Sequence, residues 1–224
     1  EKPCEKPADP HLVRGKGIAS AWKAPSMPTD CAASVIIRMN EDGTFILTCS
    51  CHDMGQGSDT TMAMMAAEIL SVDPSKIKVH TGDTDLTPYD WQTVASRATY
   101  CSGNATILAA KDLKDKILEM AQFKLGTWKK DLDIVDGYVV RKYHPEVREP
   151  ISTFALGLTL EDGSGIGGPA IGVGSFVVPN NIAADKKTGL SPKPVAFWTI
   201  GSIGAEVEVN TETGVIKVLK MSSV

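Results

Sequence analysis

Two glycines and an amide follow an expected strand in the segment Asp53-Met54-Gly55-Gln56-Gly57. Glycine lets the backbone approach a ligand closely, and the first amides of a helix have no intrahelical partner, so they can bind an anion. The Gln56 side chain adds donors and an acceptor oxygen. The alternative is a plain strand-to-helix turn in which Gln56 faces solvent. The residue types alone leave both interpretations open.

A second polar segment, Val94–Ala105, combines hydroxyl groups with one cation directly before an expected helix. The hydroxyls belong to Ser96, Thr99 and Ser102, and the cation is Arg97. A phosphate-bearing ligand suits such a place. An ordinary helix start capped by Ser102 explains the same residues, and this second interpretation is favoured when the segment is taken alone.

Two further patterns favour structural interpretations. Residues Gly163–Gly168 match G-x-G-x-x-G, but a dinucleotide-binding loop needs a strand before it and a helix after it, and Pro169 follows directly. We interpret this stretch as a loop. Cys49 and Cys51 alternate along a strand beside His52, which predicts that both thiols are buried on one face. No second cysteine pair has zinc-finger spacing, so we predict no metal site.

The composition restricts the class of protein. A chain of 224 residues can form one large domain or two smaller lobes. The net charge of −4 gives no basic excess for nucleic acid, and no apolar run approaches the length of a membrane span. The five cysteines are scattered and form no disulfide framework. We therefore expect a cytoplasmic protein that binds neither nucleic acid nor membranes.

The hydrophobic periodicity predicts an α+β fold of mixed sheets with packed helices. Helices are expected from Ser58 and, more clearly, through the apolar stripe that runs from Ala109 to Ala121 and ends at Gly126. Residues 143–194 give the weakest signal: a short helix near 153–160, then a Gly- and Pro-rich loop. This stretch is expected to join two sub-lobes, 14–142 and 195–224. Strands are expected at 14–22, 33–39, 44–51, 76–80, 132–135, 138–141, 205–209 and 215–219.

Taken in order, several motifs resemble the large subunit of the molybdenum hydroxylases, the xanthine dehydrogenase and aldehyde oxidase family. They are Met54–Gly57, Gly82-Asp83-Thr84, Ala95-Ser96-Arg97-x-Thr99 and Gly103-Asn104-Ala105, together with the opening residues 14–19 and the hairpin 204–220. Each motif by itself has low specificity, whereas the ordered set is specific. The resemblance covers nearly the whole chain, with residues 143–194 as its weakest part.

The resemblance implies a molybdopterin-binding domain. The family binds molybdopterin, often as its cytosine dinucleotide, and uses water to hydroxylate an N-heterocycle such as a purine, or an aldehyde. Electrons leave through iron–sulfur clusters and FAD on partner domains or subunits. What the resemblance assigns to this chain is a set of cofactor-binding residues: Met54, Gly55, Gln56, Gly57, Ala95, Ser96, Arg97 and Ala98.

Some family motifs are missing from the chain. It has no Gly-Gly-Phe-Gly loop, no Gly-Gln-x-Glu-Gly segment and no Gly-Glu-Pro with the catalytic glutamate. We therefore expect a fragment of a larger subunit, inactive alone, whose partners are the rest of that subunit and the iron–sulfur and flavin subunits or domains. The catalytic glutamate is expected outside this chain. The alternative is a non-enzymatic anion- or nucleotide-binding module that keeps the same fold. Purines, nicotinate, aldehydes and aromatic thioesters all remain open as substrates.

Overall fold

The computed structural model describes residues 4–25 and 31–224. The chain forms two compact units, which we call the sheet unit (Glu1–Ser26 with Val195–Val224) and the helix unit (Met27–Pro194). This division differs from the expected lobes, because the first strand pairs with residues 199–210 and residues 143–194 belong to the helix unit. Pairing between segments so distant in sequence leaves no trace in local periodicity.

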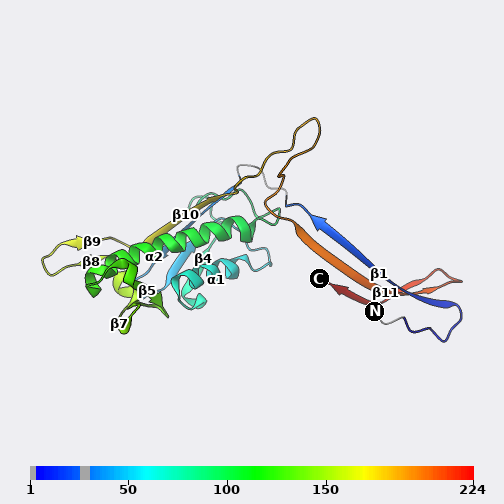
Figure 1. Cartoon of the computed structure of the whole chain (residues 1–224), viewed down its shortest axis with the longest axis horizontal. Helices are drawn as coiled ribbons and strands as arrows, with labels where there is room; N and C mark the ends of the chain where they lie inside the picture. The colour runs from blue at the N-terminus through cyan, green and yellow to red at the C-terminus, as the bar shows by residue number, and fades with distance from the viewer. Residues whose placement is uncertain (1–3, 26–30) are drawn as a thin grey trace. The chain divides into compact units, whose positions relative to one another are not determined.

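A four-stranded sheet forms the centre of the helix unit, in the order β10-β2-β3-β4 (Figure 1). The strands are β2 (Ala32–Met39), β3 (Phe45–Thr48), β4 (Ile77–His80) and β10 (Ile171–Val177). Strands β2 and β3 form an antiparallel hairpin, and β3 and β4 are parallel. The crossover between the parallel strands is helix α1 (Ser58–Leu70), as a β-α-β connection requires.

Helix α2 (Gly103–Leu125) packs along β10 and β2, and it also contacts α1 (Figure 1). Alternate residues of the strands are fully buried, including Val35, Ile37, Phe45 and Leu47. Period-two burial of this kind means that one face of the sheet is covered and the other is not. The helix predicted from Ser58, the helix predicted through Ala109–Ala121 and the α+β class are confirmed.

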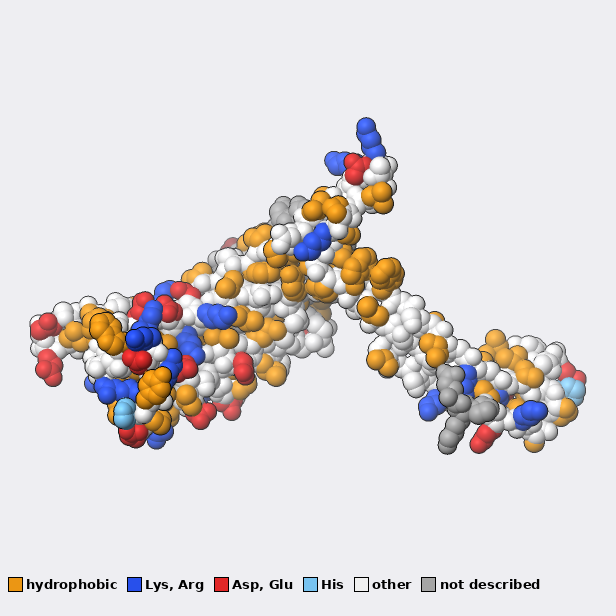
Figure 2. All heavy atoms as spheres, viewed as in Figure 1, with side chains coloured by type: hydrophobic (Ala, Val, Ile, Leu, Met, Phe, Trp, Pro, Cys, Tyr) orange, Lys and Arg blue, Asp and Glu red, His pale blue; other side chains and the backbone are white. Residues whose placement is uncertain are grey.

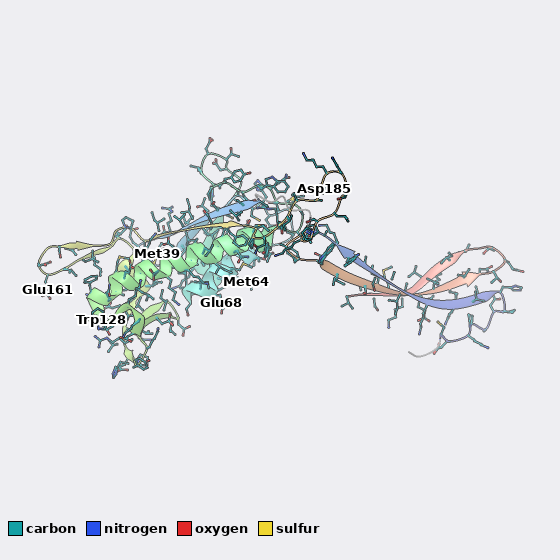
Figure 3. All side chains as sticks on the ribbon, turned by 45° about the horizontal axis from the view of Figure 1, so that its top comes forward. Met39, Met64, Glu68, Trp128, Glu161 and Asp185 are labelled. Atoms are coloured by element: carbon teal, nitrogen blue, oxygen red, sulfur yellow. The ribbon has the colours of Figure 1, made fainter. Side chains whose placement is uncertain are left out.

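Residues 143–194 contain more structure than their sequence indicates. The expected helix near 153–160 is instead a 3₁₀ turn, Ile151–Phe154, followed by a small hairpin with Glu161 near its tip (Figure 3). The expected loop contains β10, an edge strand of the main sheet. A Cβ added to Gly172 or Gly174 would overlap the α2 backbone, so these two glycines, which weaken the strand signal, let the helix pack directly on β10. The remaining strands of the helix unit are β5 (Leu132–Val135), β6 (Tyr138–Arg141), β7 (His144–Pro150), β8 (Leu158–Thr159) and β9 (Gly165–Ile166).

The sheet unit consists of one antiparallel sheet in the order β1-β11-β12. Its strands are β1 (Leu12–Lys23), β11 (Thr199–Asn210) and β12 (Ile216–Ser223). No residue in the described part of these three strands is fully buried, so the sheet has no core of its own. Among the residues that the structure describes, no helix is both long and apolar enough to cross a membrane.

Candidate functional site

The two candidate loops both border the residues that follow β3. The amide of His52 donates a hydrogen bond of 2.8 Å to Thr93 Oγ1, and the hydroxyls of Ser50 and Thr87 lie 2.6 Å apart. The Ser50 hydroxyl also donates to the carbonyl of Pro88. These bonds hold the loop between β4 and α2 against the start of the Met54–Gly57 turn.

The two helices also begin beside one buried thiol. Burial raises the pKa of Cys51, while hydrogen bonds with the hydroxyls of Ser102, at the start of α2, and Ser58, at the start of α1, oppose that shift. One turn further along each helix, Thr106 Oγ1 donates to Met62 Sδ at 3.3 Å. Helices α1 and α2 therefore run parallel and begin side by side. Their positive dipole ends lie at the same end of the helix unit.

The amides of the Met54–Gly57 turn are already occupied by a carboxylate of the chain. Asp53 Oδ1 accepts hydrogen bonds from the amides of Gly55 (2.7 Å) and Gly57 (3.3 Å), and Oδ2 accepts one from Asp59 (3.2 Å). The amides of Gly55 and Asp59 hold the pKa of the Asp53 carboxyl below its ordinary value. These amides are therefore not free for the anion of a ligand, because Asp53 supplies one, and the cofactor-binding role of the turn stays a prediction.

The Asp53→Asn variant should be less stable than the parent protein only where Asp53 is charged. Because the pKa of Asp53 is depressed in the folded state, its stabilisation is complete above the unfolded value of about 4 and is lost as the pH falls through the folded-state pKa. We expect a constant difference in unfolding midpoint from about pH 5 to pH 7 that shrinks below about pH 4. Urea unfolding across this range measures it. A difference that stays unchanged down to about pH 2 would contradict this assignment.

The Gln56 side chain folds back onto its own loop. Its Oε1 accepts from the amide of Met54 at 2.6 Å, and its Nε2 donates to the carbonyl of His52 at 2.8 Å and to Ser58 Oγ at 3.1 Å. Both donors are used, and Oε1 keeps a second lone pair. Gln56 can therefore bind a ligand as an acceptor of an N–H or O–H group, and it has no donor left for an anion.

The second loop has a strained backbone at its centre. Ala95 and Ser96 have φ values of 57° and 59°, in the left-handed region that residues other than glycine rarely adopt. Each such residue costs on the order of 1–3 kcal/mol and persists only where the surroundings enforce it, often at ligand sites. A π-helical turn, Ala98–Ser102, then leads into α2, and single π turns are also frequent at functional sites.

The side chain of Arg97 points into the fold. It forms an ion pair with Asp90, and its remaining donors bond to Cys31 Sγ at 2.9 Å and to the carbonyls of Gln92 and Ala32 at 2.6 and 2.8 Å. The Arg97 side chain is 0% exposed. The guanidinium is therefore satisfied inside the protein, and a ligand could contact Arg97 only through backbone atoms.

Asp90 holds the second loop in place, a role that the sequence did not indicate. Besides pairing with Arg97, its carboxylate accepts a 2.6 Å hydrogen bond from Ser102 Oγ. It thereby fastens the strained loop to the start of α2. A single acidic residue in a turn-rich loop does not indicate this role. The contacts with Arg97 and Ser102 form only when the folded chain brings these residues next to Asp90.

The cysteines behave as the strand pattern predicts. Cys49 and Cys51 are 1% and 2% exposed, which confirms them as small buried residues. Burial raises the pKa of Cys49 to about 12, so this thiol stays protonated at neutral pH, whereas metals bind the thiolate. Within residues 4–25 and 31–224, no group of three or more His, Cys, Asp or Glu side chains could hold a metal ion.

Comparison with known proteins decides the family. The sequence matches the model of the molybdopterin cofactor-binding domain over residues 1–224. The chain belongs to this family. It is 34% identical, over 215 residues, to an Escherichia coli (strain K12) protein named "Probable hypoxanthine oxidase XdhD", a match that covers 96% of the chain and 20% of that protein. The molybdopterin-binding chain thus spans about a fifth of the length of this relative.

Solved structures agree with the family assignment. The molybdopterin-binding domain resembles the reconstituted CO dehydrogenase from Oligotropha carboxidovorans, with a TM-score of 0.76 and 22% identity over 95% of this chain and 26% of that chain. It also resembles quinoline 2-oxidoreductase from Pseudomonas putida 86, with a TM-score of 0.75, 20% identity and coverage of 95% and 27%. At these identities the likeness shows the fold. The predicted membership in the molybdenum hydroxylase family is confirmed.

Proposed function

We propose that this chain holds molybdopterin, or its cytosine dinucleotide, within a larger molybdenum hydroxylase subunit and is inactive alone. One observation carries the proposal. The Met54–Gly57 turn and the Ala95–Ala98 loop, which the resemblance assigns to the cofactor, border the adjacent starts of two parallel helices. The dipoles of converging helix starts favour an anionic ligand such as a pterin phosphate, which the start of α2 would receive because Asp53 binds the amides at the start of α1.

Open space beside the Met54–Gly57 turn supports the proposal. Gly55 and Gly57 have φ values of 102° and 78°, and a Cβ on either would meet no atom of the described residues within 4 Å. The Met54 side chain is 72% exposed. A ring system can therefore approach the backbone of this turn closely, while the carboxylate of Asp53 keeps the turn in shape.

The residues divide the binding between them. Gln56 Oε1 would accept an N–H of the pterin ring beside Met54, Gly55 and Gly57. Ala95, Ser96, Arg97 and Ala98 would present backbone groups to the phosphate, with Arg97 and Asp90 holding that backbone in place. When bound, the molybdenum cofactor supplies two-electron oxidation of an electrophilic carbon, with oxygen taken from water. The chain's own residues bind and orient it.

The whole subunit would hydroxylate an N-heterocycle or an aldehyde in the cytoplasm. The relative named as a hypoxanthine oxidase supports a purine among these substrates. Iron–sulfur and flavin domains or subunits would accept the electrons, and the catalytic glutamate would come from the rest of the subunit.

The Gln56→Ala variant of the full-length subunit should lose cofactor while remaining folded. A hydrogen bond at such a site contributes on the order of 1–3 kcal/mol, so cofactor retention should fall about tenfold. Molybdenum content after native purification measures it, and thermal unfolding checks the fold. Gln122→Ala, the same change in the second half of α2, is the matched control and should retain molybdenum. Equal molybdenum content in both variants would remove Gln56 from the site.

The second candidate function is a non-enzymatic anion-binding module. Because Asp53 already binds the amides of its own turn, such a module would have to hold its anion at the start of α2. A full-length protein that carries no molybdenum after native purification would favour the module.

A further inference from the structure

The sheet of the sheet unit has one apolar face. Residues paired directly across antiparallel strands point to the same side, so the register sorts the side chains into two faces. One face, which we call the apolar face, carries no charged side chain from Val13 to Ala21 of β1, nor at the positions of β11 and β12 that lie across from them. Its members are Val13, Gly15, Gly17, Ala19, Ala21, Gly201, Ile203, Ala205, Val207, Val209, Ile216, Val218, Met221 and Ser223.

The opposite face carries the ion pairs of β1 and β11, beside Ile18, Trp22 and Ile200, which are 71%, 71% and 73% exposed. Arg14 lies opposite Glu208 at 2.9 Å, and Lys217 follows on the next strand; Lys16 and Glu206 pair at 3.8 Å in the same way. Such rows of alternating charge stabilise an exposed sheet surface. Among the described residues, no ion pair lies on the apolar face.

The apolar face nevertheless lies open in the described structure. Ile216, Met221 and Val218 are 65%, 63% and 54% exposed, and hydrophobic side chains are visible on the surface of this unit in Figure 2. A continuous apolar surface of this kind marks a contact with another segment. The three strands bury no residue fully in the described structure, so the sheet lacks a core without such a contact.

Two glycines indicate what kind of segment covers it. Gly15 and Gly17 lie in the middle of β1, where glycine weakens a strand, and neither has a positive φ. A Cβ at either position would meet no atom of the described residues within 4 Å. Nothing in the described packing of the sheet unit therefore requires them. Glycine in a strand interior often marks the close approach of another backbone.

The same chain shows this arrangement in its completed form. On β10, Gly172 and Gly174 are likewise spaced by one residue and share a face, and the backbone of α2 lies directly against them at Ala105 and Ala109. On β10, the two glycines of Gly-x-Gly are the positions against which a helix with small side chains packs. Gly15-x-Gly17 has the same spacing, but no described residue packs against it.

We propose that a helix packs on the apolar face of β1, β11 and β12, with small residues against Gly15 and Gly17, and that it comes from the same subunit outside residues 1–224. Both long helices described here, α1 and α2, already bury a face within the helix unit. Relatives are about five times as long as the region they share with this chain, so such a subunit has ample further chain. The proposal rests on the chain being part of a longer subunit, as in the proposed function.

Gly17→Val in the full-length subunit tests the proposal by hydrogen–deuterium exchange of the β1 and β11 amides. If a helix packs against Gly17, the added valine side chain should displace that helix. Amide exchange in β1 and β11 should then be about tenfold faster than in the parent protein. Gly204→Val is the matched control: it lies on the neighbouring strand, faces the ionic side, and an added Cβ has no neighbour closer than 3.9 Å. Its exchange should remain at the parent rate.

Every outcome decides the proposal. Unchanged or slower exchange in Gly17→Val means an open face and overturns it. Acceleration only at concentrations where the subunit self-associates, or only in complex with other subunits, assigns the face to a second copy or a separate partner and also overturns it. If Gly17→Val does not fold, Gly17→Ala, which adds one methyl group, should show a smaller acceleration by the same readout. Molybdenum content of the parent subunit tests the proposed function independently.

Discussion

Replacing Gly174 with alanine should lower the free energy of unfolding of the helix unit by about 3 kcal/mol or more. The new Cβ would overlap the carbonyl oxygen of Ala105 and the amide nitrogen of Ala109. Both obstacles are backbone atoms inside a helix of 23 residues, so neither can rotate away as a side chain would. The helix must lift from β10, which separates apolar surfaces along its length.

Urea unfolding of Gly174→Ala beside Gly165→Ala measures this effect. Gly165 lies in β9, has no positive φ, and an added Cβ there meets no atom of the described residues within 4 Å. The same change of side chain without the helix contact should leave stability within about 0.5 kcal/mol of the parent. Equal midpoints for the two variants would show that β10 does not pack against α2 as described.

Arg97→Met should cost about 3–5 kcal/mol of stability in the absence of any cofactor, because it leaves the buried Asp90 carboxylate without its partner. Lys114→Met removes one partner of the more exposed pair with Asp133 and should cost less than about 1 kcal/mol. Chemical unfolding of the apoprotein gives both values.

A double-mutant cycle with Asp90→Asn extends this test. The combined loss should be smaller than the sum of the single losses by about 1–3 kcal/mol, since a neutral amide at position 90 no longer needs a cation. If the guanidinium instead bound the phosphate of the cofactor, Arg97→Met would leave the apoprotein's stability unchanged and would reduce only cofactor retention. That result would restore the role that the sequence motif implies for the Arg97 side chain.

Most helices and strands are local in origin, which is why the sequence predicts them. Ala109 to Ala121 repeat at helical spacing and Gly126 ends the helix in the left-handed conformation, with φ of 58°. Asn40–Gly43 forms the turn between β2 and β3 as predicted. Strand β10 was not predicted because Gly172 and Gly174 weaken the strand signal. These glycines pack against the backbone of α2, a contact that sequence periodicity does not encode.

The candidate site divides in the same way. The residue types place a glycine turn and a hydroxyl-rich loop before helices, and the ordered motifs point to the family; both follow from neighbours in sequence. Which groups stay free for a ligand depends on the tertiary structure. Asp53 accepts the hydrogen bonds of the amides in its own turn, and Gln56 donates to its own loop. The ion pair with Asp90 keeps the Arg97 side chain inside the protein. A donor or a charge can bind a ligand only if no buried group of the folded chain already uses it. Which groups are used depends on residues that are close in space but distant in sequence.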